Sequence, residues 1–172
     1  MPLIKLNATQ GLTGTLPAVS GANLTNLDAG KVLQVIQGTL SSEASTSSST
    51  FADCGLSASI TPASSSNKIL VLVNLNAVQR RDNLTRLEAK LLRGSTDIAL
   101  FGGRAGYQQK YGYGSNDHHT GVGSASCNHL DSPSTTSATT YKVQFKSQGN
   151  NASVIVSSDN EPSQIILIEV QA

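Results

Sequence analysis

The sequence gathers potential metal ligands in one region, with Asp117-His118-His119 followed by His129 and Asp131. Zinc needs three or four such ligands that converge at ~2.0–2.3 Å. Neighbouring residues of a regular strand point to opposite faces, so His118 and His119 cannot both reach one ion from a strand. A three-fold axis could still collect one histidine from each of three subunits. Solvated side chains explain the cluster better, and we predict neither a metal nor a cofactor.

Catalysis finds little support in the sequence. Cys127 and His129 would share one face of a strand, but no third group that orients the pair is evident. There is no Gly-x-Ser-x-Gly elbow, and residues 102–106 lack the spacing and the lysine of a phosphate-binding loop. The 11 acidic residues are thinly spread, although a carboxylate pair for glycoside hydrolysis can arise in any fold. We therefore predict a protein that is not an enzyme.

The stretch 102–126 has the composition of a binding loop, because it combines three of the 4 tyrosines with glycines and polar residues. Tyrosine adds contact area with little loss of rotamer freedom, and flat rings beside amides and carboxylates can hold a sugar. The alternative is a long hairpin whose tyrosines pack on the rim of the domain. The predicted receptor-binding residues are Tyr107, Tyr111, Tyr113, Asn116, Asp117, His118 and His119.

Charge is scarce, since only 13% of the residues are Asp, Glu, Lys or Arg, about half the usual ~25%. The surface must therefore consist of Ser, Thr, Asn and Gln, which repel neighbouring copies weakly and favour packing in assemblies. Twelve basic and 11 acidic residues give a net charge of +1, which excludes the basic stripe that nucleic-acid binding requires. We find no secretory signal and no apolar run that approaches the ~18 residues of a membrane span.

From residue 31 onward the pattern is that of β-strands. Leu87, Ala89 and Leu91 alternate with charged residues, the period-2 signature of a half-buried strand, although a helix over 79–92 is the competing interpretation. We predict an all-β fold, a jelly-roll-like antiparallel β-sandwich of about eight or nine strands. The strands are expected at 32–37, 51–60, 69–78, 86–91, 97–101, 141–146, 154–156 and 165–168, with a polar loop or edge at 38–50.

Cys54 and Cys127 are too few for a disulfide scaffold. They are interpreted as small buried apolar residues. One disulfide between neighbouring strands is the alternative, which their spacing leaves open.

Residues 1–30 differ from the rest, because single apolar residues recur among Gly, Thr, Ser and Pro without a helical face. Such a segment cannot bury these residues against itself, so it either stays disordered or wraps around its own copies and a partner. We predict an arm over 1–30 that intertwines with its copies and attaches to a particle, followed by one domain over 31–172. The predicted attachment residues are Leu3, Ile4, Leu6, Leu12, Leu16, Val19, Leu24 and Leu27.

Several blocks resemble tail fibres of tailed phages. Residues 16–27 (LPAVSGANLTNL) are similar to collar-like repeats, and residues 30–35 (GKVLQV) look like the junction that precedes the C-terminal domain of such fibres. The remaining blocks resemble that terminal domain in marine and cyanobacterial phages: GLSASITP (55–62), NKILV (67–71), LLRGST (91–96), LDSP (130–133) and TTYKV (139–143).

The resemblance implies a homotrimeric virion protein, on the tail or the capsid, with a β-sandwich used for adhesion or decoration. The arm is about 30 residues long, which favours a short fibre or knob over a long shaft. We expect a short tail fibre or surface knob that adsorbs to a host surface glycan. A capsid or tail decoration or connector protein with no receptor role is the alternative, and a polysaccharide depolymerase comes third.

Overall fold

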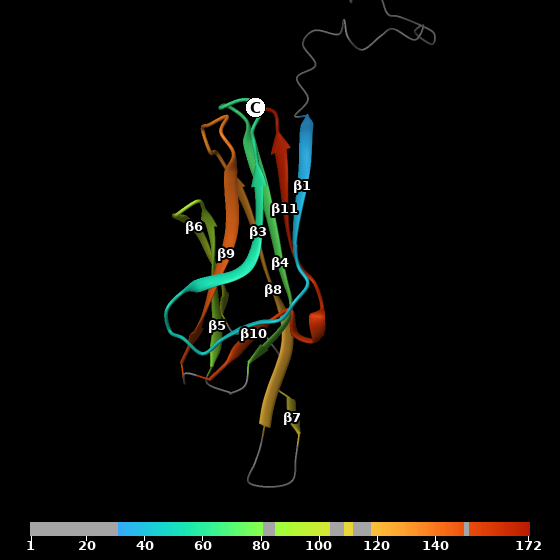
Figure 1. The fold of residues 1–172 in the computed structure, drawn as a ribbon, viewed down its shortest axis with the longest axis vertical. Helices are drawn as coiled ribbons and strands as arrows, with labels where there is room; N and C mark the ends of the chain where they lie inside the picture. The colour runs from blue at the N-terminus through green and yellow to red at the C-terminus, as the bar shows by residue number, and fades with distance from the viewer. Residues whose placement is uncertain (1–30, 81–84, 104–108, 112–117, 150–151) are drawn as a thin grey trace, which may run out of the picture.

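A computed structural model describes residues 31–80, 85–103, 109–111, 118–149 and 152–172. These residues form two antiparallel sheets that pack face to face, so the predicted all-β sandwich is confirmed (Figure 1). The larger sheet has the order β1 (Val32–Leu40), β11 (Ser163–Val170), β4 (Lys68–Arg80), β10 (Val154–Val156), β2 (Ala44–Thr46), and β8 (His118–Asp131) pairs with both β4 and β7 (Gln109–Tyr111). The smaller sheet has the order β3 (Ala52–Ile60), β9 (Thr139–Gln148), β5 (Arg86–Arg93), β6 (Thr96–Gly103).

The core lies between the two sheets and follows from the alternation in the sequence. On β4, Val71 and Leu75 are buried, and on β5 the apolar positions Leu87, Ala89 and Leu91 are fully buried while their charged neighbours face out. Each buried apolar side chain contributes roughly 25 cal/mol per Å² removed from water. The inward rows of both sheets therefore hold the sandwich together.

Most predicted strands are confirmed, including the strand rather than the helix at β5. The structure refines the prediction in two segments. The expected loop or edge at 38–50 contains the end of β1 and the short strand β2. The stretch 102–126 contains β7 and most of β8, which pair antiparallel as in the hairpin predicted as the alternative to a binding loop. Its Gly, Ser and Asn residues carry little strand propensity, but β8 pairs with the apolar strand β4 from Ile69 to Arg80. Tertiary pairing here outweighs local preference.

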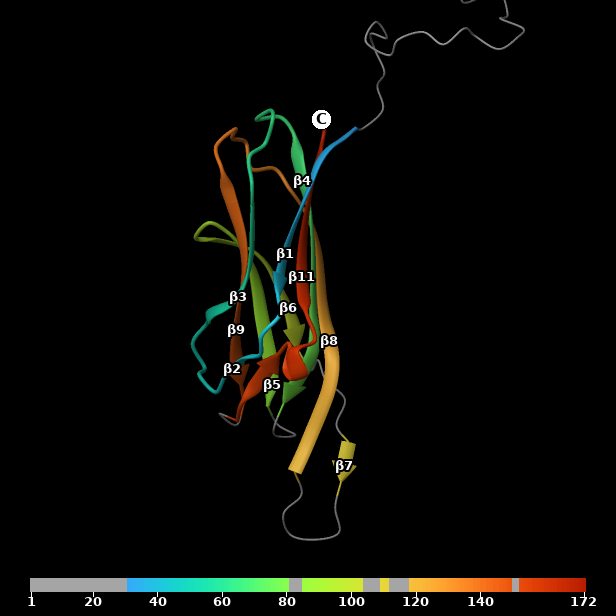
Figure 2. The ribbon, with the colours of Figure 1, turned by 45° about the vertical axis from the view of Figure 1, so that its right-hand side comes forward.

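The two ends of the sandwich differ. Lys31 O accepts a 2.9 Å hydrogen bond from Gln171 N, so the start of β1 and the end of β11 lie together, as Figures 1 and 2 show. The first residues of β5, the last residues of β6 and β9, and the strand β7 lie at the opposite end. Residues 1–30, with all the predicted attachment residues, lie outside the described residues.

The two cysteines carry free thiols and form no disulfide with each other. Cys54 is buried, and its Sγ donates to Val143 O over 3.3 Å, whereas Cys127 on β8 is half-buried. Burial raises the pKa of Cys54 to about 11. The interpretation of Cys54 as a small core residue is therefore confirmed, and that of Cys127 only in part.

Helical structure in the described part of the chain is limited to one 3₁₀ turn, Ser158–Asn160. Across those same residues, no helix is long and apolar enough to cross a membrane.

Candidate functional site

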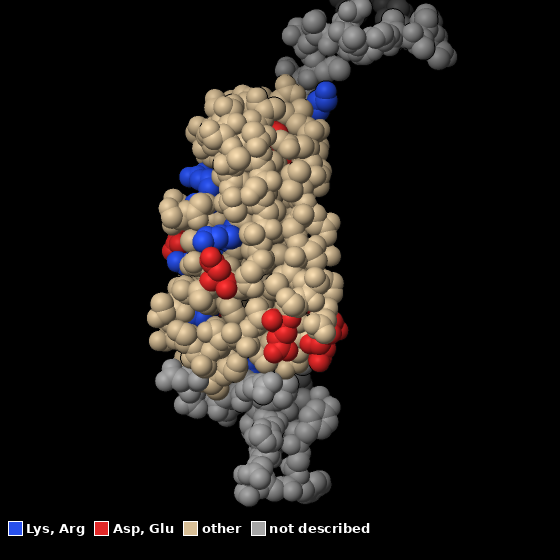
Figure 3. All heavy atoms as spheres, viewed as in Figure 1, with Lys and Arg blue, Asp and Glu red and all other residues tan. Residues whose placement is uncertain are grey.

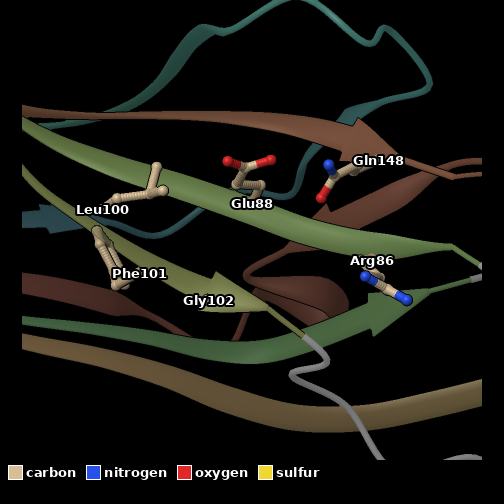
Figure 4. Close-up of a pocket in the computed structure, with 6 residues that line it drawn as sticks. All are labelled: Arg86, Glu88, Leu100, Phe101, Gly102 and Gln148. Carbon is tan, nitrogen blue, oxygen red and sulfur yellow. The ribbon is translucent and has the colours of Figure 1, made fainter.

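A hollow of about 360 Å³ opens on the smaller sheet, at the end of the sandwich where β7 lies. It is wide and shallow rather than an enclosed cavity. The side chains around it come from neighbouring strands (Figure 4). Its lining residues are Arg86, Glu88, Leu100, Phe101, Gly102 and Gln148.

Strand register brings these residues together from distant parts of the sequence. Arg86 on β5 pairs with Gln148 on β9, and Glu88 pairs with Gly102 on β6. Residues directly opposite each other on antiparallel strands share a face. Figure 4 shows Glu88 and Gln148 on the same side of β5, with Leu100 close by. The Phe101 ring turns the other way and packs against the core.

Gly102 is what keeps the place opposite Glu88 free of a side chain. Its φ is +100°, a conformation that other residues rarely adopt. A Cβ atom there would also lie 2.8 Å from the carbonyl oxygen of Leu87. Only glycine fits this position, so the hollow is a consequence of the backbone of β6.

The carboxylate of Glu88 lies beside a lysine, and one of its two oxygens is buried. Glu88 Oε2 lies 3.2 Å from Lys146 Nζ, but no described residue gives this buried oxygen a well-directed hydrogen bond. Lys146 and Lys90 also lie over the Phe51 ring, at 4.5 and 4.7 Å from its centre, where cations are attracted to the aromatic face. Lys90 in turn pairs with Asp97 at 3.0 Å. These contacts fix the position of Glu88.

The arrangement suits a ligand with several hydroxyl groups and an apolar face. A carboxylate, a carboxamide and a guanidinium group surround the rim, and Leu100 supplies apolar surface. Such groups can bind neighbouring hydroxyls of a sugar ring by hydrogen bonds. Glu88 is the single carboxylate among the described lining residues, whereas glycoside hydrolysis ordinarily uses two. The geometry favours binding over bond cleavage.

The described residues among those predicted to bind a receptor lie on strands other than those that form the hollow. β6 ends at Gly103, and β7 and β8 follow as an antiparallel pair in which Tyr111 lies opposite His118 and Lys110 opposite His119. Tyr111, His118 and His119 are thus strand residues rather than loop residues. The other four predicted residues, Tyr107, Tyr113, Asn116 and Asp117, lie outside the described residues.

Asp131, which the sequence grouped with the histidines, has a structural partner instead. Its two carboxylate oxygens accept hydrogen bonds from Arg93 over 2.8 and 2.9 Å, and one also accepts from the Tyr141 hydroxyl over 2.6 Å. Burial, with that hydrogen bond in second place, raises the pKa of Tyr141. His129 on β8 lies opposite Val71 on β4. In the ranges that the structure describes, no group of three potential ligands could hold a metal ion.

Sequence reasoning missed the residues of the hollow. The alternation of Arg86 and Glu88 with apolar residues predicts a strand, and it does not by itself mark these two residues as part of a site. The pairing of Arg86 with Gln148 joins segments far apart in the chain, so the local sequence around either residue does not predict it. The charged row on β5 was the one signal that could have pointed to this site.

The sequence matches no protein-family model, and it matches no curated protein. The likeness to phage tail fibres therefore stays a prediction from the residues.

Proposed function

We propose that this chain is a structural protein on the surface of a bacteriophage particle, a short tail fibre or surface knob, which adsorbs to a glycan on the host surface. One observation supports this most directly. Residues 1–30 join the sandwich at Lys31, at one end, while the hollow and the β7–β8 pair lie at the other end. An attachment arm and a contact surface would need this separation.

The hollow supplies the chemistry for a sugar. Glu88 and Gln148 can accept and donate hydrogen bonds to ring hydroxyls, and Arg86 can donate to hydroxyls or to an acidic substituent. Leu100 is 65% exposed and offers an apolar surface beside them. The β7–β8 pair lies at the same end of the sandwich as the hollow and would extend the contact along a glycan chain.

Such a shallow site binds weakly when it acts alone, so the proposal includes a homotrimer. Linking several weak sites raises the overall affinity by roughly 10²–10⁴ without new contacts, provided that the geometry lets them engage together. The scarcity of charge in the chain favours the assembly of like subunits.

The test is adsorption of the purified full-length protein to bacterial lipopolysaccharide and capsular polysaccharide from a panel of host strains. Glu88→Ala and Gln148→Ala should each weaken binding about tenfold, the cost of roughly 1.4 kcal/mol per lost polar contact. Ser59→Ala is the matched control, because Ser59 is an exposed polar residue of β3 at the other end of the same sheet. Binding that these variants do not change would exclude the hollow as the receptor site.

The second candidate is a decoration or connector protein that stabilises the particle and recognises no host molecule. The outward face of the larger sheet favours it, since exposed Val35 and Leu130 suit contact with another protein better than contact with a glycan. Localisation of the chain on the particle by cryo-electron microscopy separates the two candidates. A connector would be covered by neighbours at the β7 end, whereas an adhesin would leave that end exposed.

A further inference from the structure

We propose that the outward face of the larger sheet is the contact between copies of this chain. Twelve outward side chains form this face, which we call the uncharged face. They are Val35, Gln37 and Thr39 of β1, Gln164, Ile166 and Ile168 of β11, Leu70, Leu72 and Asn74 of β4, and Ser126, Asn128 and Leu130 of β8. It lies on the sheet that does not carry the hollow. The inference is independent of the proposed adsorption and names a surface for self-association.

One complete row across the uncharged face is apolar. Val35 lies opposite Ile168, Ile168 opposite Leu70, and Leu70 opposite Leu130. Val35 is 57% exposed and Leu130 is 55% exposed. Four apolar side chains in register on four adjacent strands form a continuous strip rather than scattered exposed residues. A continuous strip of this kind marks an interaction surface.

The two neighbouring rows are also free of charge. Ile166 and Leu72 lie at the centre of the second row, and the remaining positions of both rows are Gln, Thr, Asn and Ser. None of the twelve positions in the three rows carries a charged side chain.

The outer face of the smaller sheet is the opposite case. It carries the pairs Lys142–Asp53 at 3.0 Å and Lys146–Glu88 at 3.2 Å, and Lys90 lies beside them. In Figure 3 the charged side chains gather over the smaller sheet and at the ends, while the flank over β1 is largely uncharged. The twelve positions of the uncharged face carry none of these charges, and Lys68, opposite Val170, lies one row beyond it.

A second copy is the partner that this distribution fits. Around a rotation axis, a residue near the axis meets the same residue of its neighbours, so any charge there would lie beside a like charge. An uncharged face avoids that repulsion. β1 adds to the argument, because it is an edge strand of nine residues without a charged residue or a proline. Such edges readily pair with another chain.

The size of the face sets the expected strength. Four strands about 4.8 Å apart and three rows about 7 Å apart cover roughly 400 Å² of flat area. A stable contact buries about 800 Å² on each partner. The uncharged face alone therefore supports reversible association, and residues at its margin such as Val32, which is 56% exposed, would enlarge the contact.

The test is sedimentation of the full-length protein over a range of concentrations. The unchanged protein should sediment as an oligomer, and the double variant Val35→Glu with Leu130→Glu should sediment as a monomer. Both side chains are more than half exposed, so the variant should keep its fold, which circular dichroism checks. Leu100→Glu is the matched control, because Leu100 is an exposed apolar residue on the other sheet, and it should leave the oligomer intact.

Two outcomes would overturn the inference: a wild-type protein that is monomeric at about 100 μM, or a folded double variant that stays oligomeric. The glycan proposal fails separately. A monomeric double variant should still bind an isolated oligosaccharide at the hollow as strongly per site as the wild type. An oligomer that binds no glycan would refute the adsorption alone.

Discussion

Glu169 Oε1 accepts a 2.6 Å hydrogen bond from Asn67 Nδ2, although the carboxylate is fully buried near the end of β11. The backbone N–H of Ala63 donates to the same oxygen over 2.7 Å, and Gln34 donates to Oε2 over 2.6 Å. One buried carboxylate thus joins β1, β11 and the turn between β3 and β4. A buried charge without such donors would cost several kcal/mol.

Stability should therefore fall in acid because of Glu169. Burial alone would raise its pKa, but the hydrogen bonds from Asn67 and Gln34 and from the backbone of Ala63 and Ser64 outweigh that effect and lower the pKa below 4.5. A carboxylate with a lowered pKa in the folded state stabilises the protein above its unfolded pKa, and this contribution is lost as the pH falls through the folded value.

Glu169→Gln is expected to lower the free energy of unfolding by about 2 kcal/mol at pH 7. The new amide NH₂ group would face the N–H donors of Gln34, Ala63 and Asn67 instead of accepting from them. The substitution should also flatten the loss of stability below about pH 4.5, measured by urea denaturation. Glu161→Gln, at an exposed site, is the control and should change neither quantity. An acid slope that Glu169→Gln leaves unaltered would contradict the assignment.

Gly38 on β1 should tolerate no side chain. A Cβ atom there would overlap the carbonyl oxygen of Ser57 on β3 and lie 2.9 Å from Ile165 Cγ2. Backbone cannot move away as a flexible side chain can, so Gly38→Ala should cost more than about 3 kcal/mol. Gly94→Ala is the comparison: its Cβ would meet nothing within 4 Å, and only its φ of +59° opposes the change. That variant should cost about 1 kcal/mol in thermal denaturation.

Tyr141→Phe should weaken the link between the sheets without breaking it. The change removes the 2.6 Å hydrogen bond to Asp131 but leaves the bonds from Arg93 to the same carboxylate. We expect a loss of about 1 kcal/mol. Asp131→Ala should cost more, since it leaves the Tyr141 hydroxyl buried and without its partner. Equal losses for both variants in urea denaturation would show that Arg93 contributes nothing.

The two thiols should react at different rates with iodoacetamide. Burial raises the pKa of Cys54 to about 11, and burial also raises that of Cys127, which is only half-buried. Because the thiolate is the reactive form, Cys127 should be alkylated first in the folded protein, as peptide mass spectrometry can follow. Both should react alike in urea, and earlier labelling of Cys54 in the folded state would contradict its place in the core.

The fold was largely predictable because the strands are amphipathic. Leu87, Ala89 and Leu91 alternate with charged residues, and the burial of β5 follows that alternation. β8 was harder to predict because its inward residues between Gly123 and His129, Ala125 and Cys127, are small and alternate only with Ser and Asn. Its place is decided by the apolar partner β4.

The sequence did not predict the hollow. Among the described residues, the hollow shares only Gly102 with the stretch 102–126 that sequence composition singled out, and the predicted receptor-binding residues do not line it. Its polar groups come from Arg86, Glu88 and Gln148, which strand register brings together. Strand register depends on pairing across the whole sandwich, and it cannot be read directly from a single sequence.

The hydrogen bond between Lys31 O and Gln171 N has a practical consequence. Val32 and Val170 lie opposite each other on adjacent antiparallel strands, so a tight reverse turn could join them. The sandwich should accept circular permutation, with new termini opened in the exposed segment 136–138. A fluorescent protein fused after Ala172 would lie near Lys31, at the start of β1. It would leave the opposite end of the sandwich, with the hollow, unobstructed.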